Sequence, residues 1–211
     1  ELSQKRVRAS KKLVAQVKKE LRDLNMSQVE FEVSISRVNA ADGIPLPGGQ
    51  TCAFTSDGID MVEFMASTNP GEPLKPLSKI ASTGEISRFM LALKGVLSQA
   101  DNIPVLVFDE IDTGVGGRSG EVIGKKLWAL ARRRQVICVT HLPQIAAFAD
   151  AHFSVHKASG ARTVSLLQAL QGETRLKELA VMLAGPHYTE VSLDNARELL
   201  RKAEAWQKSQ V

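Results

Sequence analysis

Two short runs of consecutive apolar residues mark the centre of the chain. Residues 105–108 (Val-Leu-Val-Phe) follow the breaker Asn102-Ile103-Pro104, and residues 136–139 (Val-Ile-Cys-Val) form the second run. Each run predicts a strand buried on both faces, as in a parallel sheet. Between them, residues 119–132 carry apolar positions at helical spacing. The pattern therefore predicts a strand–helix–strand unit, with parallel strands and a right-handed crossover.

The first third of the chain starts with a helical pattern and changes to an alternating one. Residues 1–24 lack Gly and Pro and place their apolar residues on one helical face. From Val29 to Ile35 apolar and polar residues alternate, which predicts a half-buried strand. Two further strands are predicted at 51–55 and 60–66, on either side of a turn at Ser56-Asp57-Gly58, after a loop at 42–50. We therefore expect a helix followed by an antiparallel β-meander.

A second helix is predicted to start at Thr83. Ser82 and Glu85 have the spacing of a capping box, and apolar residues follow on one helical face. An exposed helix start offers free N–H groups and a positive dipole end to an anion, and Gly84 would let a phosphate approach the backbone closely. Taken alone, such a motif is usually only a helix cap.

The last third is predicted to hold a short helix from Leu142-Pro143, two strands and two helices. The strands are expected near 152–157 and 162–167 with a turn at Ser159-Gly160, and the helices near 174–184 and 189–207. His152 and His156 lie in a strand pattern with no nearby Cys. We therefore expect no metal site there.

Candidate chemistry follows the two apolar runs. Asp109 and Glu110 come directly after the first predicted strand, and His141 comes just after the second. The carboxyl ends of parallel strands share one edge of a sheet, where ligands of open α/β sheets bind. Asp109 then suits a Mg²⁺ ligand, and Glu110 a base or a group that positions water. The alternative is an ordinary acidic strand end.

Composition and charge narrow the class of protein. The 211 residues are 44% hydrophobic and 24% charged, without an apolar run long enough to span a membrane and without a signal-peptide pattern. Cys52 and Cys138 are isolated, which favours a reducing, cytoplasmic location. Residues 1–24 hold eight Lys and Arg against three Asp and Glu (+5), and the other 187 hold 19 against 20 (−1). This basic helix suits one arm of an antiparallel coiled coil with a solvated face, and less well a contact with nucleic-acid phosphates.

The order of the motifs resembles the RecN family, the bacterial DNA double-strand-break repair ATPases related to the structural-maintenance-of-chromosomes (SMC) proteins. Leu-Ser-Lys-Ile-Ala-Ser-Thr-Gly-Glu-Ile-Ser-Arg from residue 77, Val-Leu-Val-Phe-Asp-Glu-Ile-Asp from 105 and Val-Thr-His-Leu-Pro-Gln from 139 carry this resemblance. It implies an α/β fold, the C-terminal lobe (27–211) of an ABC-type ATPase head with a P-loop NTPase-like parallel sheet. Residues 1–26 would be the returning arm of a coiled coil.

The resemblance also implies roles for particular residues. Ser82, Thr83, Gly84 and Glu85 would be the signature motif, which contacts the γ-phosphate of ATP held by a second head. Asp109 would be the Walker B aspartate that holds Mg²⁺, and Glu110 the catalytic glutamate. Asp112 would be the nucleotide-binding aspartate of the D-loop, and His141 the histidine that senses the γ-phosphate. The family usually has Gly where this chain has Thr83, from which we expect a change of affinity and not a loss.

A phosphate-binding loop is the missing part. The sequence contains no G-x-x-x-x-G-K-[ST], and Gly124-Lys125-Lys126 is the nearest approach. The resemblance places that loop in an N-terminal (Walker A) lobe before the coiled coil. We therefore expect this chain to bind and hydrolyse ATP only with that lobe, in a homodimer of heads that sandwich ATP. DNA is the expected partner and the bacterial nucleoid the expected location.

Three other classes remain as alternatives. A DExD-type helicase lobe would fit Asp-Glu-Ile-Asp at 109–112, but Thr140-His141-Leu142 does not supply its Ser-Ala-Thr-like motif. A non-hydrolysing DNA-tethering scaffold head is disfavoured by the presence of Glu110 and His141. A transporter nucleotide-binding domain is disfavoured by the basic N-terminal helix and by the variant signature.

Overall fold

The computed structural model describes residues 1–80, 83–158 and 163–210, and for Thr83 the backbone alone. The chain divides into two compact units, residues 1–99 and residues 100–211. Ser82, and with it the predicted capping box, lies outside the described residues, as does the predicted turn at Ser159-Gly160. Among the helices described, none has the length and apolar character that a membrane crossing requires.

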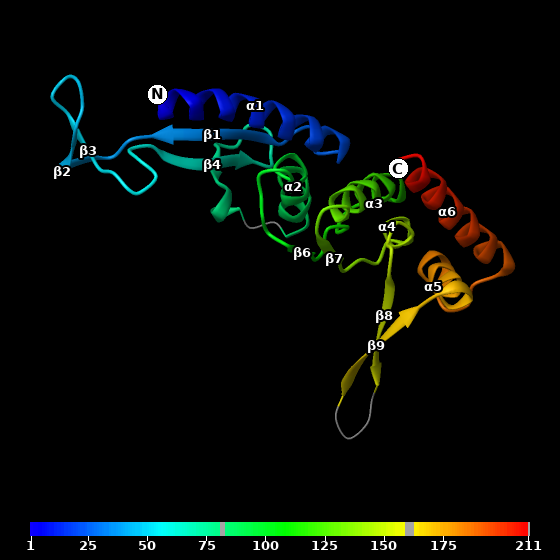
Figure 1. The fold of residues 1–211 in the computed structure, drawn as a ribbon. Helices are drawn as coiled ribbons and strands as arrows, with labels where there is room; N and C mark the ends of the chain where they lie inside the picture. The colour runs from blue at the N-terminus through cyan, green and yellow to red at the C-terminus, as the bar shows by residue number, and fades with distance from the viewer. Residues whose placement is uncertain (81–82, 159–162, 211) are drawn as a thin grey trace. The chain divides into compact units, whose positions relative to one another are not determined.

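The first unit packs a helix against an antiparallel sheet. Helix α1 (Leu2–Asp23) contacts strand β1 (Glu30–Ser36) and helix α2 (Thr83–Val96), and Figure 1 shows it lying along the sheet. Val17 and Leu21 of α1 are 0% and 1% exposed, because the predicted apolar face of the helix enters the core. Strand β4 (Met61–Ser67) pairs with β1 and with the short β5 (Lys75–Pro76), which is followed by the 3₁₀ turn η1 (Leu77–Lys79).

A separate hairpin interrupts the predicted meander. Strands β2 (Asn39–Pro45) and β3 (Thr51–Cys52) pair with each other, so the prediction of a loop over 42–50 is wrong for residues 42–45. The turn at Ser56-Asp57-Gly58 exists, closed by the bridge between Thr55 and Gly58, but it does not join paired strands. The strands predicted at 51–55 and 60–66 were expected to pair across this turn. Strand β4 pairs with β1 instead, so that expectation is wrong.

The second unit contains the predicted strand–helix–strand element. Strands β6 (Val105–Phe108) and β7 (Gln135–Cys138) are parallel and are joined by helix α3 (Gly117–Ala131). Leu106 and Phe108 are buried, whereas Val105 and Val107 are 42% and 65% exposed. The prediction of burial on both faces is therefore wrong for this chain, because only one face of the pair is covered.

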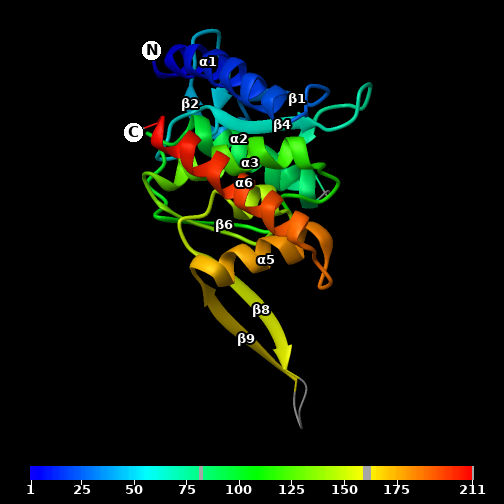
Figure 2. The ribbon, with the colours of Figure 1, turned by 90° about the vertical axis from the view of Figure 1, so that its right-hand side faces the viewer.

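Helices and a long hairpin complete the second unit. Helix α4 (Pro143–Ala146) contacts α3 and α5 (Gly172–Ala184), and α5 packs on α6 (Glu190–Lys208). Trp128 of α3 and Phe148 form edge-to-face pairs with Trp206 of α6, at 5.5 and 5.7 Å between ring centroids. Strands β8 (His152–Ala158) and β9 (Val164–Leu170) form an antiparallel hairpin that projects beyond α5 (Figure 2).

Candidate functional site

The carboxyl ends of β6 and β7 bring the predicted acidic residues and the histidine loop to one sheet edge. Phe108 is in register with Cys138, and the Val139 N–H continues the ladder by donating to the Phe108 carbonyl at 2.9 Å. Asp109 follows Phe108 directly and Thr140 follows Val139, which places the motifs at 109–112 and 140–142 side by side. The adjacency predicted from the parallel topology is confirmed.

Glu110 has an unusual backbone. Its φ of 54° lies in the left-handed region, which a residue with a long side chain rarely adopts. Its N–H donates to the Asp109 Oδ1 at 2.9 Å, and its carbonyl accepts from the Thr113 N–H at 3.2 Å. The turn that follows β6 thus holds Glu110 in a strained conformation with an exposed side chain, an arrangement that often occurs at functional sites.

Asp112 is turned inward and holds the histidine loop. Its carboxylate is 3% exposed, and its Oδ2 accepts from the Thr140 hydroxyl, from the His141 N–H at 2.8 Å and from the Leu142 N–H at 3.2 Å. The His141 Nδ1 lies 3.1 Å from the same oxygen. Burial raises the pKa of Asp112, but the hydrogen bonds from Thr140 and His141 outweigh burial and leave that pKa below its ordinary value.

This geometry gives Asp112 a role that the sequence did not reveal. The resemblance implied a nucleotide contact for Asp112, whereas in this structure the carboxylate fixes the backbone of residues 140–142. His141 itself remains 71% exposed, so its ring is available to a ligand. The sequence shows Thr140 and His141 after a predicted strand, 28 residues beyond Asp112. It does not indicate which of these side chains turns inward.

Helix α4 is fixed at its other end by Arg175. One guanidinium nitrogen of this α5 residue donates to the carbonyls of Ala146, Ala147 and Ala149 at 3.2, 3.1 and 2.8 Å. The last carbonyls of a helix lack partners within the helix, so this contact caps α4. The sequence does not indicate this role of Arg175, because a lone Arg in an amphipathic helix gives no signal of an inward contact.

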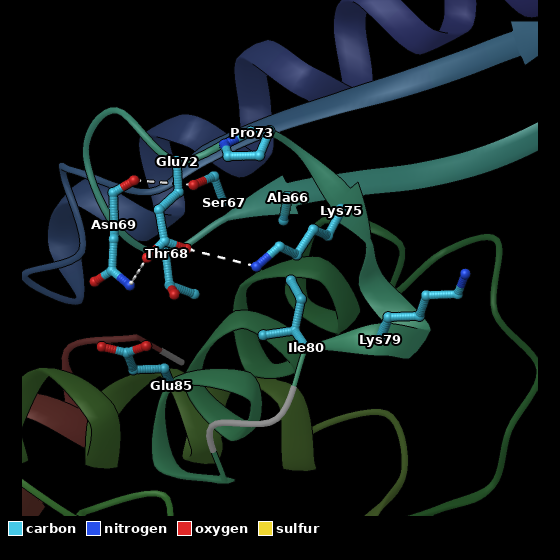
Figure 3. Close-up of a pocket in the computed structure, with 10 residues that line it drawn as sticks. All are labelled: Ala66, Ser67, Thr68, Asn69, Glu72, Pro73, Lys75, Lys79, Ile80 and Glu85. Atoms are coloured by element: carbon cyan, nitrogen blue, oxygen red, sulfur yellow. Dashed lines mark hydrogen bonds and ion pairs between the residues drawn. The ribbon is translucent and has the colours of Figure 1, made fainter.

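Helix α2 starts at Thr83, as predicted, but Gly84 is buried where an exposed start was expected. Glu85, in the first turn, lines a cavity of about 300 Å³ together with Lys75 and Lys79 (Figure 3). Glu72 also lines this cavity, and its Oε2 lies 3.8 Å from the Lys75 Nζ. Because two lysines and two glutamates line this cavity, its charge selects neither anions nor cations. The role of residues 82–85 in phosphate binding stays a prediction.

The donor groups present fit a magnesium ion only in part. Asp109 is exposed at the strand end, and no group of three or more His, Cys, Asp or Glu side chains in the described ranges could hold a metal by itself. Mg²⁺ usually binds through one or two carboxylates together with substrate phosphates and water. A single carboxylate therefore suits an ion that arrives with a nucleotide.

Cys138, at the end of β7, is not a reactive group. Burial, and then the negative charges of Asp112 and Asp109, raise the pKa of its thiol to about 12. A thiol that stays protonated at neutral pH is a poor nucleophile. Both cysteines are free, and Cys52 is buried.

No family model matches the chain, but curated proteins do. The DNA repair protein RecN of Bacillus subtilis is 40% identical over 206 residues, covering 96% of this chain and 36% of that protein. RecN of Streptomyces coelicolor is 42% identical over 205 residues, covering 97% and 36%. The chain thus spans about a third of the length of these relatives, and it aligns with their C-terminal part.

A solved structure shares the fold. The Smc head domain with a coiled coil and joint from Pyrococcus yayanosii matches 82% of this chain and 29% of its own, with a TM-score of 0.53 and 19% sequence identity. The predicted fold class, an α/β head with an N-terminal helix, is confirmed at the level of the fold.

Proposed function

We propose that this chain forms the C-terminal lobe of a head that binds and hydrolyses ATP during DNA double-strand-break repair, because it is 40% and 42% identical to the C-terminal parts of two RecN proteins. The observation that carries this proposal is the edge formed by β6 and β7. It places Asp109, Glu110 and the Asp112-held His141 loop together. A head of this kind would act in the bacterial cytoplasm, at the nucleoid.

The geometry suggests a division of labour. Asp109 would hold a Mg²⁺ ion that neutralises charge on the phosphates. Glu110, next to it in a strained turn, would orient the attacking water and accept its proton. His141 would contact the γ-phosphate from a loop whose backbone Asp112 fixes, so the imidazole would approach its ligand with little freedom left to lose.

The phosphate-binding loop would come from an N-terminal lobe. The sequence contains no such loop, and a parallel sheet is normally covered on both faces. Val107, Ile137 and Val139 are 65%, 46% and 58% exposed, an apolar face that another lobe could cover. Residues 82–85 would then contact ATP held by a second head, so that two heads close as a homodimer and ATP stabilises the dimer.

Reconstitution tests this function. The chain alone should show no ATPase activity, and mixing it with the N-terminal lobe of a RecN protein should produce turnover. In that head Glu110→Gln should lower kcat by roughly 10²–10⁴-fold, the scale of losing a general base, while ATP still binds.

Glu173→Gln is the matched control, since Glu173 is an exposed glutamate in the first turn of α5. It should leave kcat unchanged. Turnover by the isolated chain, or by the Glu110→Gln head at the wild-type rate, would contradict the proposal.

A further inference from the structure

Helix α1 presents a basic stripe on the side opposite its packed face. Val17 and Leu21 are buried against the first unit. At about 100° per residue, Arg8, Lys12 and Lys19 lie within about 40° of one another and about 180° from the midpoint of Val17 and Leu21. These three residues, which we name the α1 stripe, are exposed.

Other cations extend the stripe along the helix. Lys5 and Arg22 are exposed and lie within about 60° of its centre. From Lys5 to Arg22 the helix rises about 25 Å, at about 1.5 Å per residue. Glu1, which pairs with Lys5 at 2.8 Å, and Asp23 are the acidic residues nearest this side, and they stand at the two ends of the helix.

The charges of the stripe are not neutralised within the described ranges of the chain. Arg8, Lys12 and Lys19 have no ion pair or hydrogen bond to any side chain there. Arg8 and Lys12 are four residues apart, and like charges at this spacing slightly destabilise a helix. The helix therefore carries a small cost on this face, and a polyanion would remove it.

The same face has no apolar seam for another helix. A coiled-coil contact needs apolar residues repeating about every 3.5 positions, and the outward positions between Lys5 and Arg22 are Lys, Arg, Ala and Gln. The large exposed apolar residues of α1, Leu2 and Val7, lie elsewhere on the helix. A partner of this face must be recognised by charge.

The helix is also held rigidly. The Asp60 carboxylate, 2% exposed, accepts a bifurcated hydrogen bond from the Ser3 hydroxyl, whose Oγ lies 2.8 Å from both carboxylate oxygens, and a hydrogen bond from the Arg6 guanidinium at 3.0 Å. Arg6 also donates to the Asp57 carbonyl at 2.6 Å. These contacts fix the first two turns of α1 and, with buried Val17 and Leu21, set which side of the helix faces outward.

We propose that the α1 stripe is a contact surface for the phosphate backbone of duplex DNA. The choice of DNA as the partner rests on the proposed function, whereas the place of contact rests on the charge and rotation of α1. A row of cations about 25 Å long can lie along several phosphates of a duplex, which carries about one charge per 1.7 Å of axis. Phosphate contacts alone carry no sequence information, so binding through this stripe is independent of sequence.

Two triple variants of the chain test the location. Arg8→Gln/Lys12→Gln/Lys19→Gln removes the stripe with a residue that forms helices as well as Lys does. The control Lys157→Gln/Lys177→Gln/Lys208→Gln changes exposed lysines of the second unit. Each lowers the formal net charge from +4 by three units to +1, so a difference between them reports the position of the charge.

Binding is measured by fluorescence anisotropy with a 20-base-pair duplex, without nucleotide, across a salt series. Loss of three phosphate contacts should make the negative slope of log association constant against log salt shallower by about 2 to 3. It should also weaken binding at 50 mM salt at least about tenfold. The control variant should bind like the unaltered chain, and circular dichroism should show the same helix content for both variants.

Other results would contradict the proposal that the α1 stripe binds DNA. Equal weakening in both variants would show a general charge effect. A lack of binding by the unaltered chain at 50 mM salt would show that the stripe is not a DNA contact. Displacement of the duplex by polyglutamate at equal charge concentration would indicate an acidic protein as the partner. None of these results bears on the ATPase reconstitution, so the proposed function and this surface can fail separately.

Discussion

At the scale of single residues, Asp112 holds the backbone of the histidine loop by hydrogen bonds. Three backbone or hydroxyl donors converge on its Oδ2. Without that oxygen the Thr140 hydroxyl and the His141 N–H would lose this acceptor, whereas the Leu142 N–H would keep only the Thr140 Oγ1 at 3.0 Å. A partly buried donor without a partner costs about 1–3 kcal/mol. The carboxylate thus stabilises the fold and orients a residue of the candidate site at the same time.

Asp112→Ala should therefore lower the free energy of unfolding by about 2–4 kcal/mol at pH 7, as expected for two or more donors left unsatisfied. Because the pKa of Asp112 is lowered in the folded chain, its contribution is present above the unfolded value of 3.8 and is lost as the pH falls through the folded pKa. Urea unfolding at pH 7 and pH 3 measures both effects.

The two chains should differ less in stability at pH 3 than at pH 7. Asp112→Asn is the matched control, because the amide keeps one oxygen acceptor and should lose less than the alanine variant. An alanine variant as stable as the unaltered chain at pH 7 would show that solvent replaces the carboxylate.

The sequence predicted the place of Asp109, Glu110 and His141 but not the direction of Asp112. Adjacent ends of parallel strands follow from topology, which two apolar runs and a helix between them indicate. Asp112 turns inward two residues after Glu110, whose φ of 54° is left-handed. A sequence pattern gives no indication of such strain in a non-glycine residue.

At the scale of elements, the sequence pattern failed to predict a strand where two backbone segments approach each other closely. Strand β2 reads Asn-Ala-Ala-Asp-Gly-Ile-Pro, which lacks the alternation that predicts a strand. It pairs with β3 because Gly43 has no side chain, since a Cβ there would lie 2.1 Å from the Cys52 carbonyl oxygen. The pairing also shifts register between Asn39 and Ile44. A long-range contact of one glycine cannot be recognised from its neighbours in sequence.

Gly124 in α3 is the helical counterpart. A Cβ at Gly124 would lie 2.6 Å from the Phe148 ring and 3.1 Å from the Gln144 carbonyl oxygen. Ala favours a helix over Gly by about 1 kcal/mol, but overpacking a core costs about 1–3 kcal/mol. Because one clashing atom belongs to backbone, we expect Gly124→Ala to lower the free energy of unfolding by about 1–2 kcal/mol.

Gly95→Ala provides the opposite expectation for thermal or urea unfolding. Gly95 lies in α2, where an added Cβ would meet nothing within 4 Å, so helix propensity alone should stabilise that variant by up to about 1 kcal/mol. Stabilisation by both changes would show that α3 and α4 can separate without cost.

At the scale of the whole molecule, the exposed face of the β6–β7 pair is the feature that composition did not reveal. A two-stranded sheet is marginally stable by itself and needs packing on its faces. Within the described part of the second unit α3 packs on β7, while Val107, Ile137 and Val139 stay exposed. The fold class could be predicted because three motifs resemble a known family. The one-sided burial could not, since apolar runs look the same in a complete sheet and in part of one.

Val107→Glu/Val139→Glu tests whether this face receives an N-terminal lobe. In the isolated chain both side chains are more than half exposed, at 65% and 58%, so the double variant should unfold within about 0.5 kcal/mol of the unaltered chain. In the reconstituted head the same carboxylates would be buried without partners, which costs several kcal/mol. Co-purification with the N-terminal lobe of a RecN protein should therefore be lost.

Leu183→Glu/Val191→Glu changes apolar residues that are 38% and 68% exposed elsewhere in the second unit, and this control should still co-purify. Retention of the lobe by the Val107→Glu/Val139→Glu chain would place the junction on another surface.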